Sequence, residues 1–396
     1  MIIADHPVGS RLPTAAATPF VAEGTAELRL CSPEMPDSLE GRLYSDLPQL
    51  AIHLITFRDA TLLTVTFQHA LMDAMGFSAL LTAWTAVLRG EEDKVPPFVG
   101  FDQDPLAPLT EQASPVPYIL ADRVLKGVRF FGFVLRHVFD LLWYRKESGR
   151  IIFIPGEHVD RMREEALTSL AGQATDSTKP FLSDGDILIS WVTRAVLAGI
   201  KIASNRTVII VNIFSCRDIL AELGHLPSKG AALITNAILP SYTLLSAREI
   251  LEKPLSFVAS RVRRSLEQQR TKEQVPAIAV LLKKAMDQSG RLSLFGDSSS
   301  QLITWSNWHK AKLFQVDFSP AVVKTGIDLA NRATPLGRPS YIHSLGTSRG
   351  MPFRNSGVVR GKDHAGNWWL GLFLRDEAWS RVEQQLESTW KTDPSI

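Results

Sequence analysis

The chain has 396 residues, of which 45% are hydrophobic and 21% charged, an ordinary globular composition with ample material for a core. Its 43 basic and 41 acidic residues leave a net charge of +2, which gives no sign of the clustered positive charge that a nucleic-acid partner requires. Two cysteines, Cys31 and Cys216, form neither a CxxC pair nor a disulfide framework, and the first residues lack the apolar run of a signal peptide. We therefore expect a cytoplasmic protein.

The first quarter of the chain predicts an irregular start, a β-hairpin and a helix. Residues 1–40 are rich in Pro, Ala, Thr and Ser and indicate irregular structure. The ranges 50–57 and 61–67 alternate as two strands of a hairpin. The helical stretch 77–88 then ends at a cation followed by glycine, Arg89-Gly90. Six prolines between residues 95 and 117 indicate a linker.

The rest of the chain alternates helices and strands, which predicts an α/β protein. Residues 124–144 form an apolar helix whose charges make a transmembrane span unfavourable, so we expect a packing helix, with a membrane-surface helix as the alternative. A capping box at Ser183 precedes a further apolar helix, and Pro254 is expected to kink another. The other expected helices are 157–171, 187–202, 247–270, 272–288 and 376–390, and the other expected strands are 151–154, 207–213, 231–239, 358–360 and 368–374.

One short pattern between the hairpin and the first helix carries chemistry. His69 stands at the end of the second strand, and Asp73 opens the helix four residues later. Sheet ends hold a side chain in a fixed direction, and histidine can take and return a proton near neutral pH. The alternative is a packed histidine beside an ordinary Asp helix cap. The spacing alone leaves both interpretations open.

The residues around this pattern decide between them. The segment 46–90, with His-Ala-Leu-Met-Asp-Ala-Met-Gly inside it, resembles the HxxxD segment of the BAHD acyltransferases, and most closely their fungal branch. Four later segments resemble that family's motifs in the same order, namely 211–217, 234–237, 305–308 and 316–321. The resemblance implies an α/β fold of two chloramphenicol-acetyltransferase-like halves, with mixed sheets flanked by helices and an active-site channel between them. It divides the chain into residues 1–94, a crossover linker at 95–117, and residues 118–396.

The resemblance also implies roles for individual residues. His69 is the general base, and Asp73 turns away from the channel to pair with Arg217. Asp317 corresponds to the aspartate of the DFGWG motif and has a structural role, although Ser-Pro-Ala follows Asp-Phe where the family has Gly-Trp-Gly. Candidates for binding substrate or the oxyanion are Ser306, Asn307 and Trp308.

The family implies acyl-CoA as co-substrate and a small hydroxylated secondary metabolite as acceptor, with no metal and no bound cofactor. We expect a monomer without nucleic-acid partners. The acceptor, the acyl chain and the choice between O- and N-acylation are not encoded in any motif.

Three alternatives remain open at this level. Only 68 residues precede His69, fewer than the family usually carries, which suggests that the gene model starts late or that the first half is reduced. A reduced first half would suit an inactive paralogue that only binds a metabolite or CoA. The GxSxG match around Ser348 suggests a serine hydrolase, but the residues after it make a poor helix. A condensation-type domain would carry a second histidine where Gln68 stands.

Overall fold

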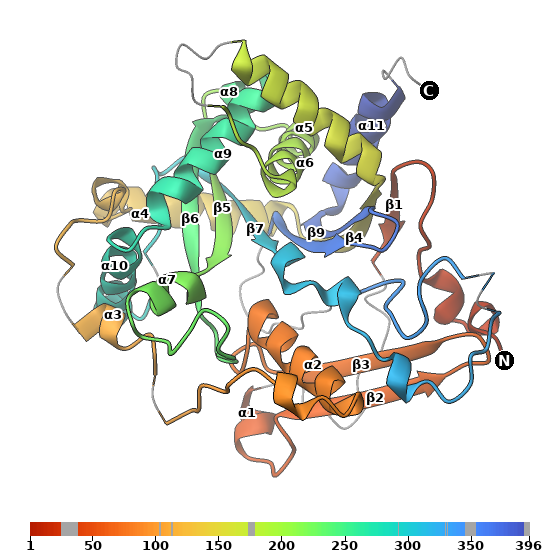
Figure 1. Cartoon of the computed structure of the whole chain (residues 1–396). Helices are drawn as coiled ribbons and strands as arrows, with labels where there is room; N and C mark the ends of the chain where they lie inside the picture. Colours follow the sequence, from red (N-terminus) through yellow and green to blue (C-terminus); the bar gives the residue numbers. More distant parts are fainter. Residues whose placement is uncertain are drawn as a thin grey trace.

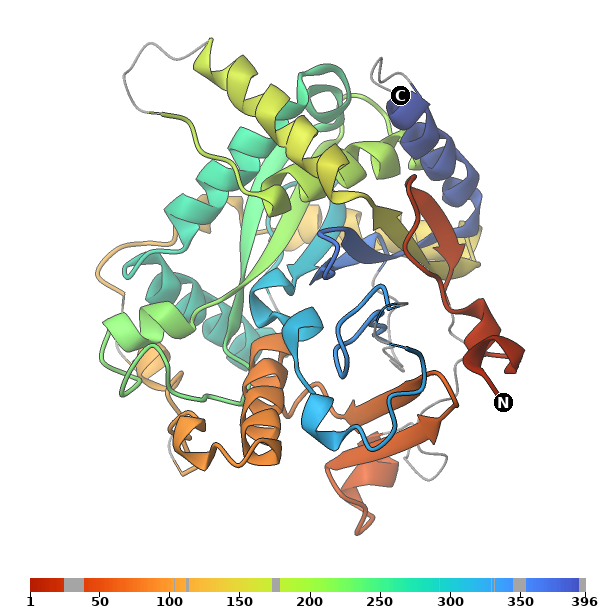
Figure 2. The ribbon, with the colours of Figure 1, turned by 45° about the vertical axis from the view of Figure 1, so that its right-hand side comes forward.

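A seven-stranded mixed sheet forms the centre of the computed structural model (Figures 1 and 2). The model describes residues 1–24, 39–102, 104–111, 114–172, 179–291, 293–328, 330, 332–344 and 354–391. In sheet order the strands are β1 (Phe20–Glu23), β4 (Glu147–Ile154), β9 (Trp368–Arg375), β8 (Ser356–Lys362), β7 (Gln301–Asn307), β5 (Thr207–Ser215) and β6 (Ile238–Ser246). The pairs β5–β7 and β7–β8 are parallel, and the other pairs are antiparallel.

Helices cover both faces of this sheet. The main core lies between the sheet and five helices, which are α5 (Gly156–Ala171), α6 (Asp184–Ile200), α8 (Ala247–Glu252), α9 (Leu255–Gln269) and α11 (Asp376–Lys391). On the other face, α10 (Gln274–Ser289) packs Ile278 against Ile209 and Val211 of β5. In the view of Figure 1, α4 (Gly127–Trp143) passes behind the sheet.

Strand β4 illustrates why a sheet covered on both faces reads as a continuous apolar run. Successive side chains point to opposite faces, so Ile152 and Ile154 join the main core, whereas Ile151 and Phe153 pack against Trp369 on the other side. All four side chains of Ile151–Ile154 are fully buried.

The predicted hairpin forms a separate two-stranded sheet. Strands β2 (Leu50–Thr56) and β3 (Thr61–Phe67) pair in antiparallel register, and α2 (Ala74–Leu88) follows. Figure 1 shows these elements below the seven-stranded sheet. Helix α2 packs Leu81 against Ala311 and Leu313, which come directly after β7. Short helices complete the described structure at α1 (Leu39–Leu43), α3 (Pro108–Glu111) and α7 (Arg217–Glu222).

Three sequence predictions of secondary structure need correction. Residues 1–40 are not wholly irregular, because β1 adds to the main sheet by pairing with β4. The predicted strand 231–239 was wrong, since β6 begins only at Ile238. Pro254 separates two helices instead of kinking one, because α8 ends at Glu252 and α9 starts at Leu255. The division of the chain at residues 94 and 117 stays a prediction.

No helix within the described ranges combines the length and apolar character needed to span a bilayer.

Candidate active site

The turn between β3 and α2 presents His69 at the surface. Strand β3 ends at Phe67, and the N–H of Leu71 closes a turn onto the carbonyl of Gln68 at 2.9 Å. Met72 is buried beneath this turn, whereas the His69 side chain is exposed. The imidazole makes no hydrogen bond or ion pair with any residue that the structure describes. The base candidate is therefore held by its backbone and is open to an incoming molecule.

Asp73, four residues later, is buried and surrounded by donors. Its Oδ1 accepts hydrogen bonds from the N–H groups of Met75 and Gly76 at 2.9 and 2.8 Å, which caps helix α2. Its Oδ2 accepts the N–H of Ala237 at 2.9 Å. Arg217 adds one bond to each oxygen, from Nη2 to Oδ1 at 2.9 Å and from Nη1 to Oδ2 at 3.0 Å. The carboxylate is therefore saturated by five donors.

Arg217 also donates hydrogen bonds to main-chain carbonyls, in addition to its ion pair with Asp73. It follows β5 as the first residue of α7, and its side chain is 12% exposed. The guanidinium donates to the carbonyl of Leu233 at 3.0 Å and to that of Thr235 at 2.8 Å. The predicted strand 231–239 fails over this stretch, where these carbonyls accept hydrogen bonds from a side chain instead of from a neighbouring strand.

The segment 233–237 also forms hydrogen bonds with the turn that carries His69. The amide Nδ2 of Asn236 donates to the carbonyls of His69 and Ala70 at 2.6 and 3.2 Å. Gly76 faces the carbonyl of Ile234 so closely that a Cβ would lie 1.9 Å from that oxygen. The glycine three residues after Asp73 is thus required by backbone approach.

The role of Asn236 was not predicted from the sequence, although the residue lies in segment 234–237, which resembles a family motif. The available signal was a polar pair, Thr235-Asn236, inside the apolar run 231–239. Its partners lie 166 and 167 residues away, so no local pattern could name them.

The three candidate substrate-binding residues lie together at the end of β7. The indole N–H of Trp308 donates to Oγ of Ser306 at 2.9 Å, and Oδ1 of Asn307 accepts the N–H of His309 at 3.0 Å. The Trp308 N–H therefore already has an acceptor within the protein. Across the described part of the chain, no hydrogen bond or ion pair joins this group to His69 or Asp73.

Asp317 stabilises a turn that packs on α2. Its Oδ1 accepts the N–H of Ser319 at 2.9 Å, and Arg338 lies 3.6 Å from Oδ2. The Ser319 N–H is the main reason that the pKa of Asp317 lies below its usual value, and Arg338 lowers it further. The ring of the next residue, Phe318, meets Trp84 of α2 edge to face with centroids 5.2 Å apart.

Other nucleophiles and pockets offer no competing site within the described structure. Burial raises the pKa of the Cys216 thiol to about 12, so it carries almost no thiolate at neutral pH. Ser348 and Cys31 lie outside the described residues. No cluster of three His, Cys, Asp or Glu side chains able to hold a metal occurs among the residues that the structure describes.

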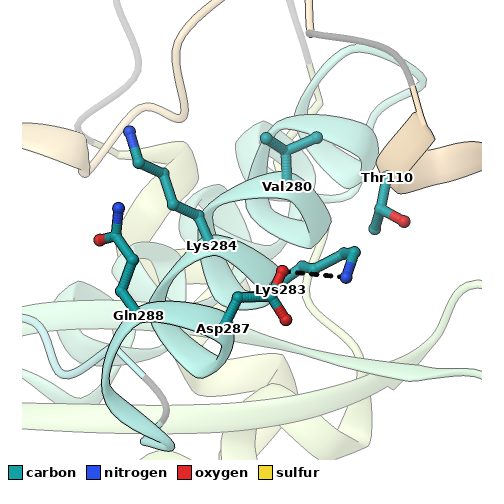
Figure 3. Close-up of a pocket in the computed structure, with 6 residues that line it drawn as sticks. All are labelled: Thr110, Val280, Lys283, Lys284, Asp287 and Gln288. Carbon is teal, nitrogen blue, oxygen red and sulfur yellow. Dashed lines mark hydrogen bonds and ion pairs between the residues drawn. The ribbon is translucent and has the colours of Figure 1, made fainter.

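A shallow pocket of about 330 Å³ lies on α10 and α3 (Figure 3). Its lining includes the exposed ion pair of Lys283 with Asp287 at 3.0 Å. It contains none of the residues that the sequence singled out.

The chain has close relatives among characterised proteins, although no family model matches it. Acetyltransferase sphE of Aspergillus fumigatus is 48% identical over 405 residues, which cover 98% of this chain and 78% of sphE. Acetyltransferase adrJ of Penicillium rubens is 38% identical over 389 residues, which cover 97% of this chain and 78% of adrJ. The crystal structure of TRI101 from F. sporotrichioides, complexed with coenzyme A and T-2, has the same fold, with a TM-score of 0.60 at 21% identity over 87% of this chain and 70% of TRI101. The chain therefore belongs to the fungal branch of the BAHD-type acyltransferases.

Proposed function

We propose that this acyltransferase moves an acyl group from acyl-CoA to a hydroxyl, or an amine, of a small secondary metabolite, with His69 as general base. The observation that carries the proposal is the exposed imidazole on a turn fixed from two sides, by Asp73 and by Asn236. TRI101, which shares the fold, binds coenzyme A together with the small molecule T-2.

The reaction runs through direct attack. The acceptor O–H gives its proton to the neutral imidazole of His69 as its oxygen attacks the thioester carbonyl. The resulting tetrahedral oxyanion collapses, the C–S bond breaks, and the leaving thiolate of CoA takes the proton back from the imidazolium. His69 is regenerated, and no covalent acyl-enzyme forms.

Asp73 serves this chemistry by position and not by proton transfer. Both of its oxygens are occupied by donors, which include two main-chain N–H groups of α2 and two guanidinium N–H groups. A carboxylate so occupied has little capacity left to accept an imidazole proton. It fixes the start of α2, and thereby the turn that carries His69. We assign Asp317 the same kind of role in the turn whose Phe318 packs on Trp84 of α2.

For the oxyanion we propose the hydroxyl of Ser306 as donor. The indole N–H of Trp308 is directed to Ser306 Oγ, which leaves the serine O–H free to donate outward. Asn307 and Trp308 then shape the binding site. The donor and the acceptor are proposed to meet between the two halves of the chain, residues 1–94 and 118–396.

The test is incubation of the protein with acetyl-CoA and malonyl-CoA and a panel of hydroxylated metabolites, with detection of products by mass spectrometry. The proposal expects an acceptor whose mass rises by one acyl group. CoA binding without transfer to any acceptor would instead favour a binding protein. Intact-mass measurement after mixing with acyl-CoA alone should show no adduct. An adduct on Ser348 would favour the hydrolase, and one on Cys31 or Cys216 a transferase with a covalent intermediate.

A further inference from the structure

Helix α4 exposes an apolar face that the described structure leaves uncovered. Seven large apolar side chains on this helix are between 40% and 88% exposed, namely Val128, Phe131, Leu135, Val138, Phe139, Leu142 and Trp143. Scattered single exposed residues are normal, but a contiguous set of this size on one element marks an interaction surface.

The spacing of these residues puts them on one side of the helix. At 3.6 residues per turn, Phe131, Leu135 and Leu142 fall within one narrow stripe, and the others flank it. The opposite side packs inward through Phe133, which is 7% exposed. The helix is therefore apolar on two sides and packs against the protein with only one.

Positively charged side chains lie beside the exposed apolar face of α4. Five exposed cations lie on α4 or next to its ends, namely Lys126, Arg129, Arg136, Arg145 and Lys146, and none forms an ion pair with a residue that the structure describes. The only acid within the helix, Asp140, is already paired with Arg354 at 2.8 Å and lies 3.6 Å from Arg375. No unpaired carboxylate of α4 offsets the five cations.

We propose that α4 lies in the surface of an anionic lipid membrane and anchors the protein there. Interfacial helices combine Trp, Phe and Leu on one face with Lys and Arg beside it, and bind through apolar burial together with attraction to anionic headgroups. The helix has 17 residues, a length of about 25 Å when it lies flat in the interface. Trp143 and Phe139, near its C-terminal end, suit the boundary between headgroups and acyl chains.

The charge distribution favours a membrane over a second copy of the chain. Contact between the α4 helices of two copies would bring the same five cations together, with no unpaired acid of α4 to meet them. Anionic phospholipid supplies the missing negative charge across the whole surface.

Vesicle flotation tests this inference without depending on the proposed function. The probes are phosphatidylcholine vesicles with and without phosphatidylserine, and the variant is Leu135→Glu with Phe139→Glu. We expect the wild-type protein to float with the phosphatidylserine vesicles and the variant to lose at least about tenfold of this binding. The control is Phe101→Glu with Val323→Glu, two apolar side chains elsewhere that are 64% and 95% exposed, which should leave binding unchanged.

A charge variant separates headgroup attraction from apolar burial. Arg129→Gln with Arg136→Gln should weaken binding to the phosphatidylserine vesicles by about fivefold per arginine, and added salt should do the same. Thermal unfolding should be unchanged in every variant, because the substituted side chains are exposed. The inference is overturned if the wild type floats with neither vesicle, or if the control variant loses as much binding. It is also overturned if light scattering shows a dimer that Leu135→Glu with Phe139→Glu dissociates.

Discussion

Asp73 and Arg217 meet across 144 residues of sequence in a bidentate ion pair, with nitrogen–oxygen distances of 2.9 and 3.0 Å. Side-chain exposures of 4% and 12% remove both groups from water. The same carboxylate caps α2, and the same guanidinium holds the carbonyls of Leu233 and Thr235. This one pair thus links the turn that carries His69 to the segment 233–237, which contacts that turn through Asn236.

Asp73→Asn should lower the free energy of unfolding by about 3–5 kcal/mol, because it leaves the Arg217 guanidinium buried without its counter-charge. Combined with Arg217→Gln in a double-mutant cycle, it should show a coupling of about 1–3 kcal/mol in urea unfolding. The exposed pair of Lys283 with Asp287 is the matched control, and Lys283→Gln with Asp287→Asn should show coupling below about 0.5 kcal/mol. Additive losses at Asp73 and Arg217 would contradict the contact.

Gly76→Ala should destabilise the protein by about 1–3 kcal/mol, because the new Cβ would overlap the carbonyl of Ile234. Helix propensity alone would favour alanine at this helical position, so the sign of the effect is diagnostic. Gly230→Ala is the control, since its nearest neighbour for a Cβ, Ser228 Oγ, is 4.0 Å away. Thermal unfolding of both variants gives the comparison, and a stabilised Gly76→Ala would show that the two backbones are not in close contact.

Asn236→Ala should lower kcat by about tenfold or more while changing KM for acyl-CoA little, because it frees the backbone of His69 and Ala70 without removing the base. Asn236→Gln, which keeps the amide donor on a longer side chain, should restore part of the rate. Steady-state kinetics of both variants measure this. If Asn236→Ala lowers the thermal unfolding temperature as well as kcat, and Asn236→Gln restores neither, the role of Asn236 is only structural.

Acid should destabilise the fold partly through His343. Burial lowers the pKa of His343 from its ordinary value of 6.5 to about 3, and the neighbouring Arg360 guanidinium contributes to this lowering. Between pH 6.5 and about pH 3, His343 is therefore protonated in the unfolded chain but stays neutral in the folded chain. The stability from neutral His343 is complete above this window and is lost as the pH falls through it.

His343→Gln should consequently flatten the decline of the urea midpoint between pH values of about 7 and about 5. His364→Gln, at an exposed position in a turn, serves as control and should leave the slope as it is in the wild type. An unchanged slope in His343→Gln would show that this imidazole does not titrate differently in the folded state.

Local features of the site were predictable from sequence, because their signals are local. The alternation in β2 and β3 predicted the hairpin, and Asp73 was recognisable as the residue that opens α2. The ion pair with Arg217 was expected only from the family resemblance, since spacing cannot reveal a contact across 144 residues.

What the sequence could not reveal depends on tertiary contacts. Residues 231–237 have the apolar composition of a strand. Two of their carbonyls, those of Leu233 and Thr235, instead accept hydrogen bonds from Arg217, and the side chain of Asn236 donates to the carbonyl of His69. Strand β1 has only four residues, and its partner β4 lies more than a hundred residues further along the chain. The direction of the Trp308 N–H toward Ser306 likewise depends on side-chain geometry.

The role of His69 as the base in direct acyl transfer is tested by His69→Gln. With acyl-CoA and an acceptor identified from the metabolite panel, we expect kcat to fall by about 10²–10⁴. Binding of CoA and the unfolding midpoint should stay at wild-type values, because the imidazole is exposed and makes no hydrogen bond within the described structure. A variant that still transfers the acyl group at near the wild-type rate would show that His69 is not the base.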